Sequence, residues 1–380
     1  MSILLNTCRK SNGTIAVSDM LPYFEVMNGR FLSQEEVTPA LSLATDQFLV
    51  SAIQETGTPV LRIYSFPGDV VLLGRYHAVG MQPQTEETIV MRRLSGGRVM
   101  PGGQGFVQFS LILPHRSALC SDDPYHLAPF QVLNRYVRGV LQGLRAGGVS
   151  AFYPGRDLIT ARQQPLGWIS FTTEESGLLL CEGGLAVHRD FSLLPYLLDR
   201  VDPQGSIPSQ FFTAEQVLSV ERLTAKAFTF SQVAGLICQG FTQQFALEFT
   251  HQDLNRSEQE EITTLAERQF SDTGLLSRLP RPDLPFQATT STQLGVLQVR
   301  FALTPEKTLA DIQFSGDFIA DPLTLSRLER ALRGCPLEQE ALWQVVDRIF
   351  LQPQSYLLGI GPLQTIPETI LRGSTAAANV

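Results

Sequence analysis

The sequence predicts an α+β protein: a mixed sheet flanked by helices, followed by a small C-terminal α/β unit. Segments with helical periodicity lie toward both ends of the first 275 residues, and several short apolar strands lie between them rather than in regular alternation. A proline-rich break follows, and a second set of strands and helices comes after it. The 380 residues and 43% hydrophobic content are enough for two cores of ordinary domain size.

These features divide the chain into four parts. Residues 1–35 have weak periodicity and read as an N-terminal extension. The main domain is expected over residues 36–275 and the linker over 276–292, where three prolines and a Thr/Ser cluster interrupt the pattern. The accessory domain is expected over residues 293–370.

The first helix is expected to begin at Thr38-Pro39, because proline is tolerated in the first helical turn. Gly57 offers a stop. One face of this helix carries Leu41, Ala44, Phe48 and Ala52. Strands are then expected over residues 60–64, 70–73 and 89–93.

A glycine-rich stretch follows the third of these strands. Arg92-Arg93 precede Ser95-Gly96-Gly97, and more glycines continue to Gly105. Backbone N–H groups in such a loop can hold an anion, and arginine binds carboxylate or phosphate with two hydrogen bonds. An ordinary glycine-rich hairpin remains the alternative. No Gly-Lys-Ser/Thr closes the stretch, so it is not the phosphate-binding loop of nucleotide hydrolases.

The next strand, over residues 106–113, alternates in side-chain type and is expected to be half-buried. A helix is predicted over residues 129–146, followed by short strands over 158–160, 169–173, 177–180 and 184–188. Two further helices are predicted, the first around Val233, Ile237, Phe241 and Phe245 and the second after a capping box at Ser257–Glu260. Beyond the linker, strands over 295–302 and 308–314 precede a helix that begins at Asp321-Pro322 and a last helix that carries Leu342, Val346 and Ile349.

Composition excludes several classes of protein. The net charge of -8 and the pI near 5.3 argue against a general nucleic-acid or membrane-surface binder. The first residues lack the pattern of a signal peptide, and no apolar run is long enough to span a bilayer. The five cysteines are widely spaced and read as reduced thiols of a cytoplasmic protein. The histidines are scattered, so no metal site is expected.

The order of segments resembles the lipoate–protein ligase A family, which is grouped with octanoyltransferases and biotin ligases. The run Arg92-Arg93-Leu94-Ser95-Gly96-Gly97 is similar to the family's Arg-Arg-x-Ser-Gly-Gly signature, and the match continues ungapped to Phe109-Ser110. The similarity covers roughly residues 38 to 365. Its other elements are Gly74-Arg75, Asp157-Leu158 with Gly167, Val220 to Thr224, and Gly316-Asp317-Phe318. The repeated Gly-Arg pairs of biotin ligases are absent, which disfavours that branch.

The resemblance implies a catalytic-type domain that makes an acyl-adenylate from ATP, with Mg²⁺, and lipoate or octanoate. The acyl group then passes to a lysine of a lipoyl carrier domain, so the partners would be that carrier and a small carboxylic acid, with no nucleic acid or membrane. Residues expected to bind the acyl-adenylate are Arg75, His77, Arg92, Arg93, Ser95, Gly96, Gly97, Arg98, Gly105, Asp157, Gln164 and Gly167.

The central residues of both known routes are missing. The family lysine corresponds to Gln164, and the cysteine of one octanoyltransferase branch corresponds to Gln204. Arg98 is a possible substitute for the lysine, because a guanidinium keeps its charge and binds phosphate, but it also fits a solvated loop arginine. Cys181 follows an apolar run and reads as an inert core thiol more readily than as a nucleophile. Three hypotheses therefore stand. The first is a divergent ligase or acyltransferase, and the second is a non-catalytic protein that binds a lipoyl group, its carrier or a nucleotide. The third is altered chemistry on a different carboxylic acid.

Overall fold

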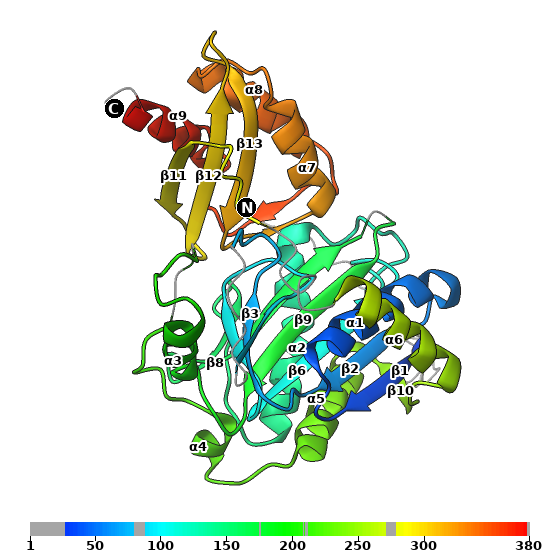
Figure 1. Cartoon of the computed structure of the whole chain (residues 1–380). Coiled ribbons are helices and arrows are strands. Elements are labelled where there is room, and N and C mark those ends of the chain that lie inside the picture. Colours follow the sequence, from blue (N-terminus) through cyan, green and yellow to red (C-terminus); the bar gives the residue numbers. More distant parts are fainter. Residues whose placement is uncertain are drawn as a thin grey trace, which may run out of the picture.

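The protein is built around a seven-stranded mixed sheet, in the order β10–β1–β2–β6–β9–β8–β7 (Figure 1). The computed structural model describes residues 27–79, 88–174, 176–207, 209, 212–270 and 279–377. β1 runs parallel to both β10 and β2, and the other neighbours are antiparallel. The strands are β1 (Met27–Gln34), β2 (Val60–Tyr64), β6 (Phe106–Leu113), β7 (Leu158–Ala161), β8 (Gln164–Thr173), β9 (Leu179–Ala186) and β10 (Leu247–His251).

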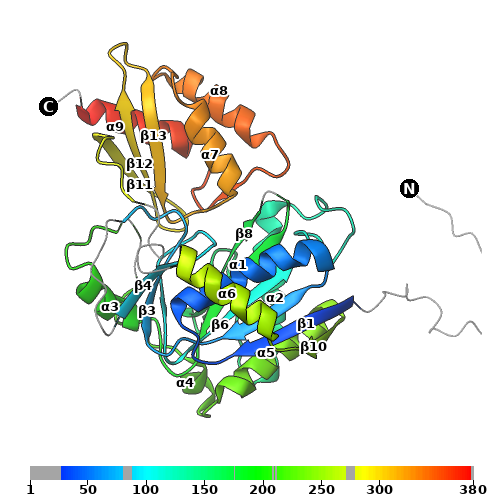
Figure 2. The same ribbon diagram turned by 45° about the vertical axis from the view of Figure 1, so that its right-hand side comes forward.

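Helices cover both faces of this sheet (Figure 2). On one face lie α1 (Pro39–Thr56) and α6 (Arg256–Gln269), and on the other lie α2 (Val132–Ala146) and α5 (Phe230–Phe245). Ser110 of β6 donates to Asp46 of α1 at 2.9 Å. The preceding residue, Phe109, meets Phe241 of α5 with ring centroids 6.5 Å apart. Adjacent residues of a strand point to opposite faces, so β6 is covered on both sides.

A smaller sheet, in the order β4–β3–β5, carries the glycine-rich stretch. It consists of β3 (Asp69–Leu73), β4 (Thr88–Arg92) and β5 (Met100–Gly102). Its apolar residues share a core with α3 (Leu193–Val201), and the short helix α4 (Val220–Thr224) follows that helix along the chain. The glycine-rich stretch thus connects β4 to β5 and leads into β6 of the main sheet.

The C-terminal part has its own sheet and apolar core, and it lies above the main sheet in Figure 1. The antiparallel strands are β11 (Phe286–Ser291), β12 (Val296–Leu303) and β13 (Leu309–Gly316). The helices are α7 (Pro322–Ala331), α8 (Gln339–Phe350) and α9 (Thr365–Ala377), and the short strands β14 (Ile319–Ala320) and β15 (Leu357–Leu358) pair beneath them. The predicted α+β class is confirmed, whereas the four domain boundaries stay predictions.

Most of the predicted helices and strands are present, and their local signals work as expected. α1 begins at Pro39 and ends at Gly57, whose left-handed φ of 62° suits a residue without a Cβ. Of the expected apolar face of α1, only Ala44 is fully buried. The buried apolar side chains are mainly Leu43, Leu49, Val50 and Ile53, because the helix packs against both the sheet and α6.

Three local predictions were wrong, and two strands, β1 and β11, lie where the sequence predicted none. Residues 27–34, assigned to the extension, form β1, while residues 1–26 lie outside the described part. The two strands expected over 177–188 are the single strand β9, which continues through Gly183-Gly184. The N-cap of α6 is Asn255 rather than Ser257, and β11 lies inside the predicted linker. β6 was expected to be half-buried, but all eight of its residues are buried because helices and the glycine-rich stretch cover both faces.

Candidate functional site

The glycine loop, residues 93–105, is held in shape by Arg93. The guanidinium of Arg93 donates to the carbonyls of Gly96 at 2.7 Å and Arg98 at 2.8 Å. It also lies over the ring of Trp168, 4.6 Å from the centroid. Burial lowers the pKa of Arg93 to about 10, even though Glu182 and other nearby acids favour its charged form. Arg93 therefore remains charged at neutral pH and stabilises the loop from inside.

Several backbone donors of the glycine loop bond to other parts of the protein. Ser95 N donates to Glu182 Oε2 at 2.7 Å, and Gly97 N donates to the carbonyl of Phe318 at 2.7 Å. A Cβ at Gly96 would stand 2.2 Å from that same carbonyl, which explains why glycine is needed there. The loop thus packs against the β13–β14 corner of the C-terminal part, and these N–H groups do not face an open anion site.

Arg98, the proposed substitute for the family lysine, is paired with Asp157. Its Nη2 and Nε atoms contact the two carboxylate oxygens at 2.6 and 2.9 Å, and its guanidinium lies over the ring of Phe212. Burial alone would lower the pKa of Arg98, but the charge and hydrogen bonds of Asp157 raise it. Arg98 is therefore not a solvated loop arginine, and its bidentate capacity is used inside the protein.

His77 and Arg92 lie at the contact with the C-terminal part. His77 is fully buried; its Nδ1 lies 3.1 Å from the carbonyl of Gly74 and its Nε2 lies 3.0 Å from Asp317 Oδ1. Arg92 donates to the carbonyls of Gly74 and His77. Tyr76 stacks on Phe318 with centroids 4.8 Å apart. This stretch of the chain therefore joins the main sheet to the C-terminal part.

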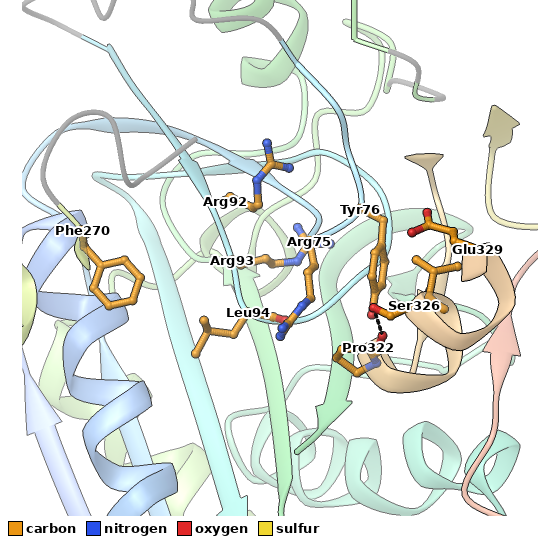
Figure 3. A pocket seen from close by; sticks show the side chains of 10 residues that line it. Arg75, Tyr76, Arg92, Arg93, Leu94, Phe270, Pro322, Ser326 and Glu329 are labelled. Carbon is orange, nitrogen blue, oxygen red and sulfur yellow. Dashed lines mark hydrogen bonds between the residues drawn. The ribbon is translucent and has the colours of Figure 1, made fainter. Parts of the chain in front are cut away.

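A cavity of about 370 Å³ lies between the arginines and α7 (Figure 3). We call it the arginine cavity; it is lined by Arg75, Tyr76, Arg92, Arg93, Leu94, Phe270, Pro322, Leu325, Ser326 and Glu329. Arg75 is half-buried and donates to the carbonyl of Leu94 at 3.1 Å. Within the described residues it forms no ion pair, so its charge is available to an anionic ligand. The lining combines arginines with apolar side chains and one acidic residue, Glu329. The arginines and the apolar surface together suit a carboxylic acid or its phosphate ester.

A buried polar layer lies behind the glycine loop, on the α1-facing side of the main sheet. We call it the inner layer; its members are Asp46, Arg62, Gln108, Ser110, Trp168, Ser170 and Glu182. Arg62 is paired with Asp46 at 2.8 Å, and Ser170 donates to the carbonyl of Gly96 at 2.9 Å. Burial, and then the charge of Asp46, raise the pKa of Glu182. Polar groups this deeply buried are costly unless they have partners, so the layer is a candidate ligand-binding region.

The predicted site residues do not form a single site in the structure. Arg75, Arg92 and Arg93 line the arginine cavity, whereas Ser95, Gly96, Gly97 and Arg98 form the turn of the glycine loop. His77 and Asp157 are buried partners at the edges of this region. Three residues lie apart from the cavity lining: Gly105 accepts from Val187 N and His188 N, Gln164 begins β8, and Gly167 pairs with Leu185.

The sequence analysis did not find the inner layer. It also missed Asp317 as the buried partner of His77. A charged Glu182 within a run of buried β9 residues was the available signal. Gln204, at the family's cysteine position, is exposed, whereas nearby Asp202 is buried and accepts from Ile207 N. Cys181 is fully buried and burial raises its pKa, as expected for an inert thiol.

Among the described residues, no cluster of His, Cys, Asp or Glu could hold a metal ion, and no helix could span a membrane.

The fold is similar to that of lipoate–protein ligases. LipL1 of P. falciparum, in complex with lipoate, matches with a TM-score of 0.64 at 13% identity, over 91% of this chain and 100% of that chain. The bipartite lipoate protein ligase of Thermoplasma acidophilum, solved in a study with its E2 lipoyl domain, gives 0.53 at 19% identity, over 67% and 98%. Lipoate-protein ligase A bound with ATP gives 0.52 at 20% identity, over 66% and 100%.

At the sequence level, no family model and no curated protein matches this chain. The structural likeness nevertheless confirms the predicted resemblance at the level of the fold: the chain has the mixed α+β fold of lipoate–protein ligases.

Proposed function

We propose that this chain is a lipoate–protein ligase-like protein that acts in protein lipoylation and attaches lipoate or octanoate to a lysine of a lipoyl carrier domain. The observation that carries the proposal is the arginine cavity, which adjoins the glycine loop within this fold. Arg75 supplies a cation without a carboxylate partner among the described residues, and Leu94, Phe270 and Leu325 supply an apolar wall.

In the proposed reaction, a carboxylate oxygen of the acid attacks the α-phosphorus of ATP, and pyrophosphate leaves. The amine of the carrier lysine then attacks the acyl carbon, loses a proton, and displaces AMP. Arg75 would bind the carboxylate and the α-phosphate, where negative charge develops in the first step. Mg²⁺ would arrive with the nucleotide, since it is usually bound through phosphates and one or two carboxylates.

Three solved structures of similar fold support the choice of ligands and partner. LipL1 was solved in complex with lipoate, and lipoate-protein ligase A was solved with ATP bound. The Thermoplasma ligase was solved in a study with its E2 lipoyl domain, which supports a carrier domain as partner. We propose the cytoplasm as the site of action, as the reduced cysteines suggest.

A second function, non-catalytic binding, is favoured by the surroundings of Arg98. Gln164 stands at the position of the family lysine, and Arg98 would have to leave Asp157 before it could reach a phosphate. Losing one preorganised donor typically costs about 10²–10³ in rate. In this version the chain binds the acyl group or its carrier without turnover.

Lipoate- and octanoate-dependent ATP–pyrophosphate exchange distinguishes these functions. The ligase proposal expects exchange that is lost in Arg75→Ala and retained in Arg256→Ala, a matched arginine exposed on α6. Loss of exchange in Arg98→Ala would show that Arg98 leaves Asp157 during turnover. Binding of lipoate or of a lipoyl domain without exchange identifies the non-catalytic function. If neither binds and no exchange occurs, both versions are wrong.

A further inference from the structure

Several buried polar atoms of the inner layer and the adjoining loop have no hydrogen-bond partner among the described residues. They include Gln108 Nε2 and Oε1, Trp168 Nε1, Arg62 Nη2, Ser95 Oγ and Arg93 Nε. Gln108 and Trp168 are only 1% and 3% exposed, so solvent at the surface does not satisfy them. Buried polar groups in folded proteins nearly always have partners, and exceptions cluster where a ligand or water belongs.

The positions of Gln108 and Trp168 bring their polar ends together. Gln108 of β6 is paired with Gly184 of β9, and Gly184 is paired with Trp168 of β8. A Cβ at Gly184 would stand 2.3 Å from Gln108 Oε1 and 2.6 Å from Trp168 Nε1. The amide and the indole N–H therefore converge over a residue that has no side chain. They form one polar group rather than two isolated ones.

This polar group adjoins the arginine cavity. Arg93 lines the cavity, and its guanidinium covers the ring of Trp168. Arg93 therefore separates the cavity from Trp168 and Gln108, and a ligand with its charged end beside Arg75 has to pass this side chain to reach them.

The unpartnered atoms indicate the chemistry of the missing group. Most are donors: the indole N–H, the Gln108 amide nitrogen and Arg93 Nε, with the Ser95 hydroxyl able to act either way. One carbonyl, Gln108 Oε1, can only accept. A ligand oxygen that accepts from Trp168 and Gln108, next to an N–H that donates to Gln108, would satisfy both kinds. A carboxamide has this arrangement, whereas an alkyl or dithiolane end leaves every one of these atoms unpaired.

We propose that the acid bound by this chain carries a carboxamide-type group at the end remote from its carboxylate, and that Gln108 and Trp168 are the residues that select it. This proposal rests on the proposed function, because it takes the carboxylate to lie in the arginine cavity. It keeps the two-step reaction of the proposed function but replaces lipoate and octanoate as the preferred acids with one that has a polar end.

The test compares the binding of octanoate, lipoate and suberic acid monoamide by calorimetry. The monoamide should bind at least about tenfold more tightly than octanoate, which corresponds to one neutral hydrogen bond. Trp168→Phe, which keeps a ring under Arg93, and Gln108→Leu should each remove this preference. Trp343→Phe is the matched control, because it changes the other tryptophan of the chain, in α8.

Trp343→Phe also provides a direct signal. Trp168 is then the only tryptophan, so a hydrogen bond to its N–H should shift its fluorescence when the monoamide binds but not when octanoate binds. Thermal unfolding of each variant identifies any that fail to fold, and the fluorescence of Trp343→Phe tests the contact independently of them.

The outcomes separate the two proposals. If octanoate or lipoate binds at least as well as the monoamide, or if the preference survives in both variants, the inference on specificity is wrong and the proposed function stands. If none of the three acids binds, the proposed function is wrong and the inference is wrong with it.

Discussion

Both faces of the main sheet are buried, but they differ in chemistry: one is apolar, and the other carries buried polar residues beside smaller apolar clusters. Toward α2 and α5, the central strands present Ile63, Phe109, Leu111, Ile169 and Phe171, all within one apolar core. Toward α1 and the glycine loop, the same strands present Arg62, Gln108, Ser110, Ser170 and Glu182. Burial is complete on both sides, so access to solvent does not explain the difference.

The comparison shows which face supports the fold and which is available for function. An apolar face gains stability in proportion to its buried area. A buried polar face gains little, and each unpartnered group on it costs about 1–3 kcal/mol. The polar side lies under the glycine loop and beside the arginine cavity, so we interpret it as the binding side of the sheet. Five variants test this difference between the two faces.

The largest effect is expected for Asp46→Ala on the polar face. The change leaves the fully buried Arg62 without its carboxylate partner at 2.8 Å. An unpaired buried charge should lower the free energy of unfolding by about 3–5 kcal/mol in urea titrations. Asp253→Ala, at an exposed carboxylate, should change it by less than about 0.5 kcal/mol. Equal losses of unfolding free energy at the two sites would contradict the buried ion pair between Asp46 and Arg62.

Leu111→Ala tests the apolar face. Leu111 is fully buried between Leu61 and Cys181, and its truncation should cost about 2–5 kcal/mol of unfolding free energy. Leu351→Ala is the control, because that side chain is 73% exposed and its loss should be nearly neutral. A small effect at Leu111 would mean that this face does not carry the main core.

A pH-dependent effect is expected for Glu182→Gln. Burial raises the pKa of Glu182 above its ordinary 4.5, so the folded state holds the proton more tightly than the unfolded state. The stability that this provides is complete below pH 4.5 and is lost as the pH rises through the raised pKa. The unfolding free energy of the wild type should therefore fall relative to Glu182→Gln above pH 4.5.

Glu221→Gln should show the opposite pH dependence of the unfolding free energy. The hydrogen bond from His188 lowers the pKa of Glu221, so its small contribution should be lost as the pH falls through that pKa. Parallel pH profiles for the two variants would refute the assignment of a raised pKa to Glu182.

The smallest effect is expected for Thr172→Val, on the α1 side of β8. Thr172 Oγ1 is buried without a partner among the described residues, so its removal should leave the unfolding free energy unchanged or raise it by up to about 1 kcal/mol. Thr45→Val is the matched control in α1: its hydroxyl donates to the carbonyl of Leu41 at 2.7 Å, and its loss should cost about 0.5–1.5 kcal/mol. A larger loss at Thr172 than at Thr45 would indicate a partner that the structure does not contain.

Local sequence signals were sufficient for most of the fold. The proline at Pro39 and the left-handed Gly57 follow from short-range sterics. The inward side of α2 follows from helical periodicity, which predicts Leu133, Val137, Val140 and Leu144 there. β1 was missed because its stability comes from pairing with β2 and β10, which lie far away in the sequence. β11 pairs with the next strand, β12, but its Thr289-Thr290-Ser291 run was interpreted as part of a linker. Gly183-Gly184 was taken for a break, yet these glycines make room for Phe109 on one face and for Gln108 and Trp168 on the other.

The sequence by itself determined the α+β class and the resemblance to lipoate–protein ligases, whereas ligand binding by the arginines before Ser95 stays a prediction. These properties follow from residue type and spacing along the chain. Only the tertiary structure decided that Arg98 is paired with Asp157, that Phe318 contacts the glycine loop, and that Arg75 lines a cavity with α7. The partners of each group are dozens to hundreds of residues apart, and a side chain's charge becomes available or occupied only when folding sets its neighbours.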